Sequence, residues 1–203
     1  MLAKSAQFNA ITNLITHYWG TWLLLVIWIS TQYGGGPSLW DYSRAAITDG
    51  QLWRVLSGHF VHLNTTHLLM NSLGLLGIVG VWGAALNGAR PLWLSMSIGL
   101  GISVSLWLGE PQLQHYAGAS GVLHGLFAAG IILARDVDLR FRFFAGAALI
   151  TKLIAETQFN TGSAELIGAP VIHAAHQWGA VWGTLIASVY LAFNWAFNLA
   201  RRR

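Results

Sequence analysis

Long apolar runs alternate with short polar or charged turns, and this pattern restricts the fold more than any other feature of the sequence. Each run is close to the roughly 20 residues that a helix needs to cross about 30 Å of hydrocarbon. The six runs cover residues 17–33, 61–86, 92–109, 118–134, 141–157 and 169–199. Lipid offers no hydrogen bonds to the backbone, so such runs predict transmembrane helices. We therefore expect an all-α membrane protein, with six spans forming one domain over residues 1–203.

The composition agrees with a protein embedded in the lipid bilayer. Hydrophobic residues make up 55% of the chain and charged residues only 9%, whereas soluble domains carry about 25% charged residues. The net charge of +4 does not indicate nucleic-acid binding, because the basic residues lie at the ends of apolar runs. The absence of cysteine excludes thiol chemistry. The run at 17–33 resembles a signal peptide in part, but its basic flank is weak and no A-x-A site follows, so we expect a retained span.

The distribution of basic residues predicts the orientation of the spans. With the N-terminus inside, eight basic residues fall in cytoplasmic segments and two, Arg44 and Arg54, fall outside. By the positive-inside rule, both termini are cytoplasmic. The second, fourth and sixth runs then begin at the outer face. Residues 34–60 mix aromatic and charged side chains without a complete apolar span, which predicts a first loop lying in the interface.

The fourth run opens with a serine between small residues, Gly118-Ala119-Ser120-Gly121. Small neighbours leave the hydroxyl accessible, and a helix N-terminus presents free backbone N–H groups. This combination suits a nucleophile beside an oxyanion site.

The second and sixth runs place further polar residues at a similar depth. His67, Ser120 and His176 all fall within roughly 10 Å of the outer helix ends at about 1.5 Å per residue. Histidine can serve serine as general base, and His67 and Asn71 share a helix face at i, i+4. Small-xxx-small pairs in the fourth and sixth runs predict close packing of those two helices. Glu156, the only acid inside a run, is spaced to pair with Lys152, so the sequence favours a Ser–His dyad without a carboxylate.

These motifs together resemble the rhomboid intramembrane serine proteases, over essentially the whole chain. The segment from Gly118 to Gly121 is similar to their serine motif, and the segment from Ala175 to Gly183 is similar to their A-H-x-x-G-x-x-x-G motif. His67 to Asn71 resembles an H-x-x-x-N motif, and Trp53-Arg54 resembles the W-R of the first loop. The resemblance implies a six-helix rhomboid bundle with Ser120 as nucleophile and His176 as base. It also implies that His67 and Asn71 help to form the oxyanion site.

One position departs from the common family pattern and resembles the rhombosortase branch. Most rhomboids carry an aromatic residue four positions after the serine, and here that position is His124. The resemblance implies bacterial substrates with a C-terminal Gly-Gly motif, one transmembrane helix and a basic tail, cleaved in the inner membrane at a site open to the periplasm. Gly118, Gly121, His124 and His173 are expected to surround the catalytic pair. Either packing on His176 or hydrogen bonding in the cavity would suit His124.

Three other functions remain open from the residues alone. The chain could be a general rhomboid protease for single-span membrane proteins, or an inactive relative that binds such proteins, although Ser120 and His176 are both present. Six of the eight histidines lie near the outer ends of alternate runs, which could also suit a zinc or haem protein. No H-E-x-x-H motif is present. We expect no cofactor and no metal.

Overall fold

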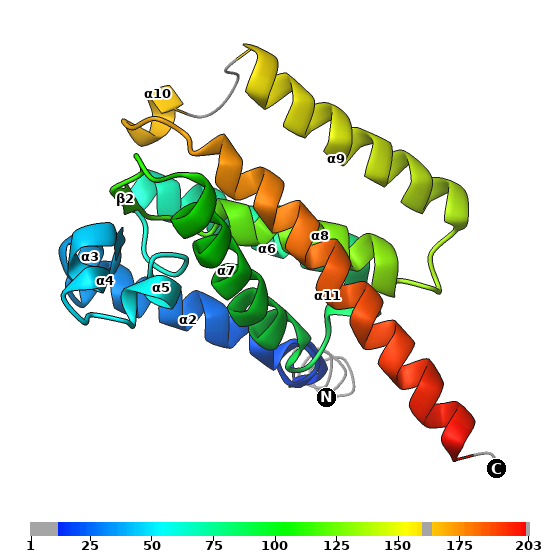
Figure 1. The fold of residues 1–203 in the computed structure, drawn as a ribbon. Coiled ribbons are helices and arrows are strands. Elements are labelled where there is room, and N and C mark those ends of the chain that lie inside the picture. The colour runs from blue at the N-terminus through cyan, green and yellow to red at the C-terminus, as the bar shows by residue number, and fades with distance from the viewer. Residues whose placement is uncertain (1–11, 160–163, 202–203) are drawn as a thin grey trace.

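The computed structural model describes residues 12–159 and 164–201, and it is built almost entirely of helices (Figure 1). In chain order, the elements are α2 (Trp19–Tyr33), α3 (Gly36–Trp40), β1 (Tyr42–Ser43), α4 (Arg44–Thr48), α5 (Arg54–Ser57), α6 (Thr65–Trp82), η1 (Gly83–Leu86), α7 (Arg90–Gly109), β2 (His115–Tyr116), α8 (Ser120–Leu133), α9 (Leu139–Phe159), α10 (Ala164–Ile167) and α11 (His173–Ala200). A long helix therefore lies within or across each of the six predicted runs.

Three of these helical segments are long and apolar enough to cross a membrane: Thr65–Leu86, Arg90–Gly109 and His173–Ala200. The helix α8 is apolar but has 14 residues, and α2 has 15. The helix α9 has sufficient length but carries four charged residues. The helical fold is thus shown, while the count of six spans and the orientation of the termini stay predictions.

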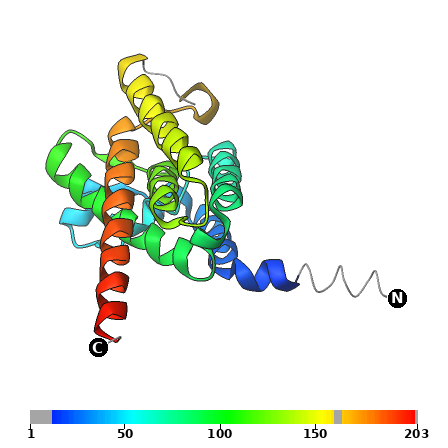
Figure 2. The same cartoon turned by 90° about the vertical axis from the view of Figure 1, so that its right-hand side faces the viewer.

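The helix α8 lies at the centre of the bundle, and α9 lies at its edge. Eight of the 14 residues of α8 are buried, and its main packing partner is α11. By contrast, the buried set of α9 consists of Glu156 alone. Both views place α9 at the periphery beside α11 (Figures 1 and 2). The helix that begins with Ser120, α8, is therefore packed against several neighbours. By contrast, α9 buries the polar side chain of Glu156.

Two helix starts differ from the apolar runs because local capping and a loop set them. The second run begins near residue 61, but α6 begins at Thr65, because the side chain of Asn64 accepts a hydrogen bond from the His67 backbone N–H at 2.9 Å. The sixth run begins near 169, but α11 begins at His173, after a loop that contains Pro170. Both shifts place a polar residue in the first turn of a helix.

The first loop, 34–60, folds into short elements around the buried Arg54. The Arg54 guanidinium is 2.5 Å from the Asp41 carboxylate and also donates to the Ser38 carbonyl at 2.9 Å. Asp41 leads into β1, which pairs antiparallel with β2, with Tyr42 opposite Tyr116. The strand β2 comes directly before the serine-bearing helix. Arg54 of the Trp53-Arg54 motif therefore stabilises the paired strands β1 and β2 that precede α8.

Candidate active site

The structure brings the predicted serine and histidine into direct contact. Ser120 is the first residue of α8 and His176 lies in the first turn of α11. The Ser120 Oγ is 2.9 Å from His176 Nε2. This is the range in which a histidine can remove a hydroxyl proton. His176 is buried, and both residues line one cavity.

Glycines on both helices make this contact possible, as the small-xxx-small pattern predicts. A Cβ added at Gly121 would lie 2.7 Å from the Ala175 carbonyl oxygen, and one added at Gly125 would lie 2.7 Å from the Gly179 carbonyl oxygen. Such distances are too short for real Cβ atoms. The backbones of α8 and α11 therefore touch along the face that presents Ser120 and His176.

The turn before Ser120 requires a glycine. Gly118 has φ of +135°, a region that side chains rarely adopt. A Cβ there would also lie 2.5 Å from the Cε1 atom of His67. Two hydrogen bonds hold this turn: Tyr116 Oη donates to the Gly118 carbonyl at 2.7 Å, and the Gly118 N–H donates to the Gly58 carbonyl at 2.9 Å. The first loop thus fixes where α8 starts.

Two side chains that line the cavity beside the pair carry polar atoms for which the described residues supply no hydrogen-bond partner. Its volume is about 290 Å³, and it is lined by His67, Asn71, Tyr116, Ser120 and His176, among others. Among the described residues, no acceptor lies within hydrogen-bonding range of the buried Asn71 Nδ2, and no partner reaches His67 Nδ1. Buried donors are normally satisfied, so an unpaired one needs an explanation. An oxyanion formed at Ser120 would supply that missing acceptor.

His124 both stacks on His176 and forms hydrogen bonds. The two ring centroids are 4.2 Å apart with 16° between the planes. His124 Nδ1 lies 2.7 Å from the Ser120 carbonyl oxygen, and its Nε2 lies 2.9 Å from Lys152 Nζ. The ammonium group can only donate, so Nε2 accepts and Nδ1 carries the hydrogen. The departure from the family pattern keeps a flat ring on His176 and adds a link to α9.

A carboxylate does accompany the pair, which corrects the expectation drawn from the sequence. Glu156 Oε2 is 2.9 Å from His176 Nδ1, while the other carboxylate oxygen binds Lys152 Nζ. The Glu156 side chain is only 9% exposed. The i, i+4 pairing with Lys152 is present, but a carboxylate has two oxygens and the second is free to reach α11. The fact that Glu156 is the sole acid inside an apolar run was the signal of this contact.

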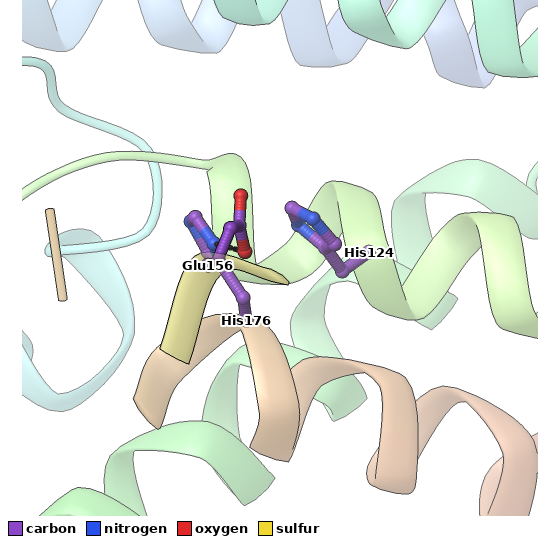
Figure 3. Close-up of side chains that lie close together, drawn as sticks. All are labelled: His124, Glu156 and His176. Carbon is purple, nitrogen blue, oxygen red and sulfur yellow. Dashed lines mark hydrogen bonds and ion pairs between the residues drawn. The ribbon is translucent and has the colours of Figure 1, made fainter. Parts of the chain in front are cut away.

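His124, Glu156 and His176 also have the composition of a metal site. Their candidate ligand atoms lie within 4.8 Å of one another (Figure 3). In this arrangement each of these atoms already has a protein partner. The Lys152 ammonium contacts both His124 and Glu156, so it supplies the positive charge that a metal ion would bring. An ion would have to displace Lys152, and the residues as placed fit a hydrogen-bonded network better.

Three further histidines are packed against other side chains, one of them beside His176. The ring centroid of His173 is 6.1 Å from that of His176. His59, near the end of the first loop, is fully buried, and its Nε2 is 2.9 Å from Ser103 Oγ. The ring of His62 lies between those of Trp28 and His67, with centroids 5.3 and 5.2 Å away. Of the histidines near the outer ends of the runs, His173 therefore lies beside His176, whereas His59 and His62 pack against other side chains.

Comparison with known proteins identifies the same region. A family model described as Rhomboid domain matches residues 49–193. Rhomboid-like protein 11, chloroplastic, of Arabidopsis thaliana is 30% identical over 143 residues, which cover 66% of this chain and 51% of that protein. YdcA of Bacillus subtilis (strain 168), named as an inferred rhomboid protease, is 28% identical over 87 residues, covering 43% of this chain and 44% of that protein. The chain thus spans about half the length of the curated relatives it matches.

Proposed function

This chain belongs to the rhomboid family, and on that premise we propose that it is an intramembrane serine endopeptidase with Ser120 as nucleophile and His176 as general base. The observation that carries this proposal is the 2.9 Å contact between Ser120 Oγ and His176 Nε2. It links two helices, α8 and α11, whose backbones approach closely beside these side chains.

The proposed reaction is acyl transfer to the serine. Ser120 Oγ attacks the carbonyl carbon of the scissile peptide bond, its proton passes to His176 Nε2, and the carbonyl electrons move onto oxygen. The intermediate collapses, the C–N bond breaks, and His176 returns the proton to the leaving amine. Water then attacks the acyl-enzyme with the same base, which releases the acid and restores Ser120.

The oxyanion site of the proposal consists of Asn71, His67 and the backbone N–H of Ser120. Asn71 lines the cavity, and its Nδ2 finds no acceptor within residues 12–159 and 164–201, which supports this role. A preorganised donor of this kind contributes on the order of 10²–10³-fold to kcat. The donors must face the oxygen of the intermediate rather than that of the substrate carbonyl.

The substrates we propose are single-span proteins of a bacterial inner membrane that carry a C-terminal Gly-Gly motif before the transmembrane helix and a basic tail. His124 in place of the usual aromatic residue supports this rhombosortase-type assignment. The cavity of about 290 Å³ is small among ligand pockets, and a Gly-Gly segment needs little room. The proposal includes six spans, cytoplasmic termini and a cavity open to the periplasm.

Labelling with a fluorophosphonate tests the nucleophile. Purified wild-type protein should be labelled, and Ser120→Ala and His176→Ala should not be, although both still fold and insert. Labelling should persist in EDTA, since the proposed reaction uses no metal. Cleavage of a substrate by the Ser120→Ala protein would refute the assignment.

A matched pair of substrates tests the branch separately. Two single-span proteins are compared that differ only in having Gly-Gly or Leu-Leu before the transmembrane helix. The Gly-Gly protein should be cleaved faster. Equal cleavage of both would leave a general rhomboid protease and reject the rhombosortase assignment.

A further inference from the structure

One side chain of α9, that of Glu156, is buried, and it contacts His176, the general base of the proposed pair. Glu156 is the buried residue of this helix, and its Oε2 contacts His176 Nδ1 at 2.9 Å. The dashed contact in Figure 3 joins these two side chains from α9 and α11. An acid inside an apolar helix is costly to place, so such a residue usually has a function.

We propose that Glu156 is a positioning residue that fixes the tautomer and orientation of His176, which rests on the proposed function of Ser120 and His176. An ionised carboxylate only accepts hydrogen bonds, so His176 Nδ1 carries the hydrogen and donates it to Glu156. His176 Nε2 is then left with a lone pair that faces Ser120 Oγ. This is the tautomer that can take the serine proton.

The same contact stabilises the charged state of His176 during the reaction. When Nε2 takes the serine proton, the ring becomes an imidazolium, and the carboxylate against Nδ1 balances its charge. Glu156 itself neither gains nor loses a proton in the step. The site therefore functions as three residues, Ser120, His176 and Glu156, rather than as a dyad.

Lys152 keeps the carboxylate ionised in this apolar setting. Its Nζ contacts Glu156 Oε1 on the same helix and His124 Nε2 on α8. An isolated carboxylate would be strongly disfavoured in the membrane interior, whereas a paired one is tolerated. His124, held by Lys152, stacks on the face of His176. The His176 ring is thus fixed at its edge by Glu156 and at its face by His124.

Glu156 is not needed merely to hold α9 against α11, because a neighbouring pair of side chains already joins these two helices. Thr157 Oγ1 accepts a hydrogen bond from Gln177 Nε2 at 2.8 Å. This pair joins the same two helices, one residue further along each, and does not touch Ser120 or His176. It supplies a matched control, because Thr157→Val removes an α9–α11 hydrogen bond without altering the charge.

The test compares Glu156→Gln and Thr157→Val with the wild type in detergent, using one single-span substrate for steady-state kinetics and the fluorophosphonate labelling rate. Correct placement of a general base contributes about 10²–10⁴-fold, so Glu156→Gln should lower kcat and the labelling rate by at least about 100-fold with KM nearly unchanged. Thr157→Val should change neither by more than about threefold. A loss in Glu156→Gln below about tenfold, or one matched by Thr157→Val, would overturn the proposal.

A spectroscopic measurement on the wild-type protein tests the same role if Glu156→Gln fails to fold. In ¹⁵N-histidine NMR of the wild-type protein, the signals absent from His176→Ala belong to His176. They should show a protonated Nδ1 and an unprotonated Nε2, and the opposite tautomer would refute the role of Glu156. If Ser120→Ala retains labelling, the proposed function fails. If Ser120→Ala loses labelling while Glu156→Gln remains fully active, only the present inference fails.

Discussion

Replacing Gly125 by alanine should separate the two helices that hold Ser120 and His176. The added Cβ would lie 2.7 Å from the Gly179 carbonyl oxygen and 2.7 Å from Ile98 Cγ2, whereas ordinary contact begins at 3.4 Å. The carbonyl belongs to the backbone and cannot rotate away, so α8 and α11 must move apart by about 0.7 Å, the difference between 2.7 and 3.4 Å. The Ser120–His176 distance of 2.9 Å would then approach about 3.6 Å, which is no longer a hydrogen bond.

This displacement predicts a loss of activity as well as a loss of stability. Misplacing a reacting group by about 1 Å can cost on the order of 100-fold, so we expect kcat to fall by about 10- to 100-fold. Overpacking of this kind lowers the free energy of unfolding by about 1–3 kcal/mol. Substrate cleavage in detergent gives kcat, and thermal unfolding of the same preparation gives the stability.

Gly77→Ala is the matched control for this experiment. Gly77 lies inside α6, and a Cβ added there meets no atom within 4 Å. Alanine should therefore leave activity intact and favour the helix by up to about 1 kcal/mol. If Gly125→Ala cleaves substrate as fast as Gly77→Ala, the close approach of α8 and α11 does not set the distance between serine and base.

Three further outcomes are expected. Asn71→Ala should lower kcat by about 10²–10³-fold with little change in KM or melting temperature, and an unchanged kcat would remove Asn71 from the oxyanion site. Arg54→Met should lower the free energy of unfolding by about 1.5–3 kcal/mol, because the half-buried Asp41 carboxylate loses its guanidinium partner and keeps only His115 Nδ1 among the described residues; an unchanged melting temperature in detergent would contradict this. Burial lowers the pKa of His59, in the loop before α6, to about 3, so unfolding takes up a proton as the pH falls below about 6.5. The free energy of unfolding should thus decline from pH 6.5 toward pH 3, by up to about 1.4 kcal/mol per pH unit. Over that range the wild type should lose stability relative to His59→Leu, and a constant difference between the two proteins would refute the assignment.

The long helices could be predicted because apolar runs and their breakers are local features. The runs at 92–109 and 118–134 agree within two residues with α7 and α8. Glu110-Pro111 ends the first of these where proline cannot continue a helix. Hydropathy places the start of α6 four residues too early, because the side chain of Asn64 decides where the first turn begins.

The contact between Ser120 and His176 could also be expected, for a reason that is only partly local. Glycines at i, i+4 on two runs indicate two helices that approach closely, and each helix carries its polar residue beside those glycines. The fold of the first loop could not be read in the same way. Its anchor is the ion pair between Arg54 and Asp41, and nothing in their spacing of 13 residues specifies that pair.

Glu156 shows most clearly what spacing within one helix leaves out. The i, i+4 relation to Lys152 accounts for one carboxylate oxygen, and from the sequence alone that pair looks complete. The second oxygen contacts a ring that is 20 residues away in the chain and on another helix. Which oxygen faces inward depends on the rotation of α9 about its axis, and this helix has charges at both ends and an apolar surface on most sides, so hydropathy does not define its inner face. The presence of an acid in an apolar run could be noticed from the sequence, but its partner depends on how two helices pack.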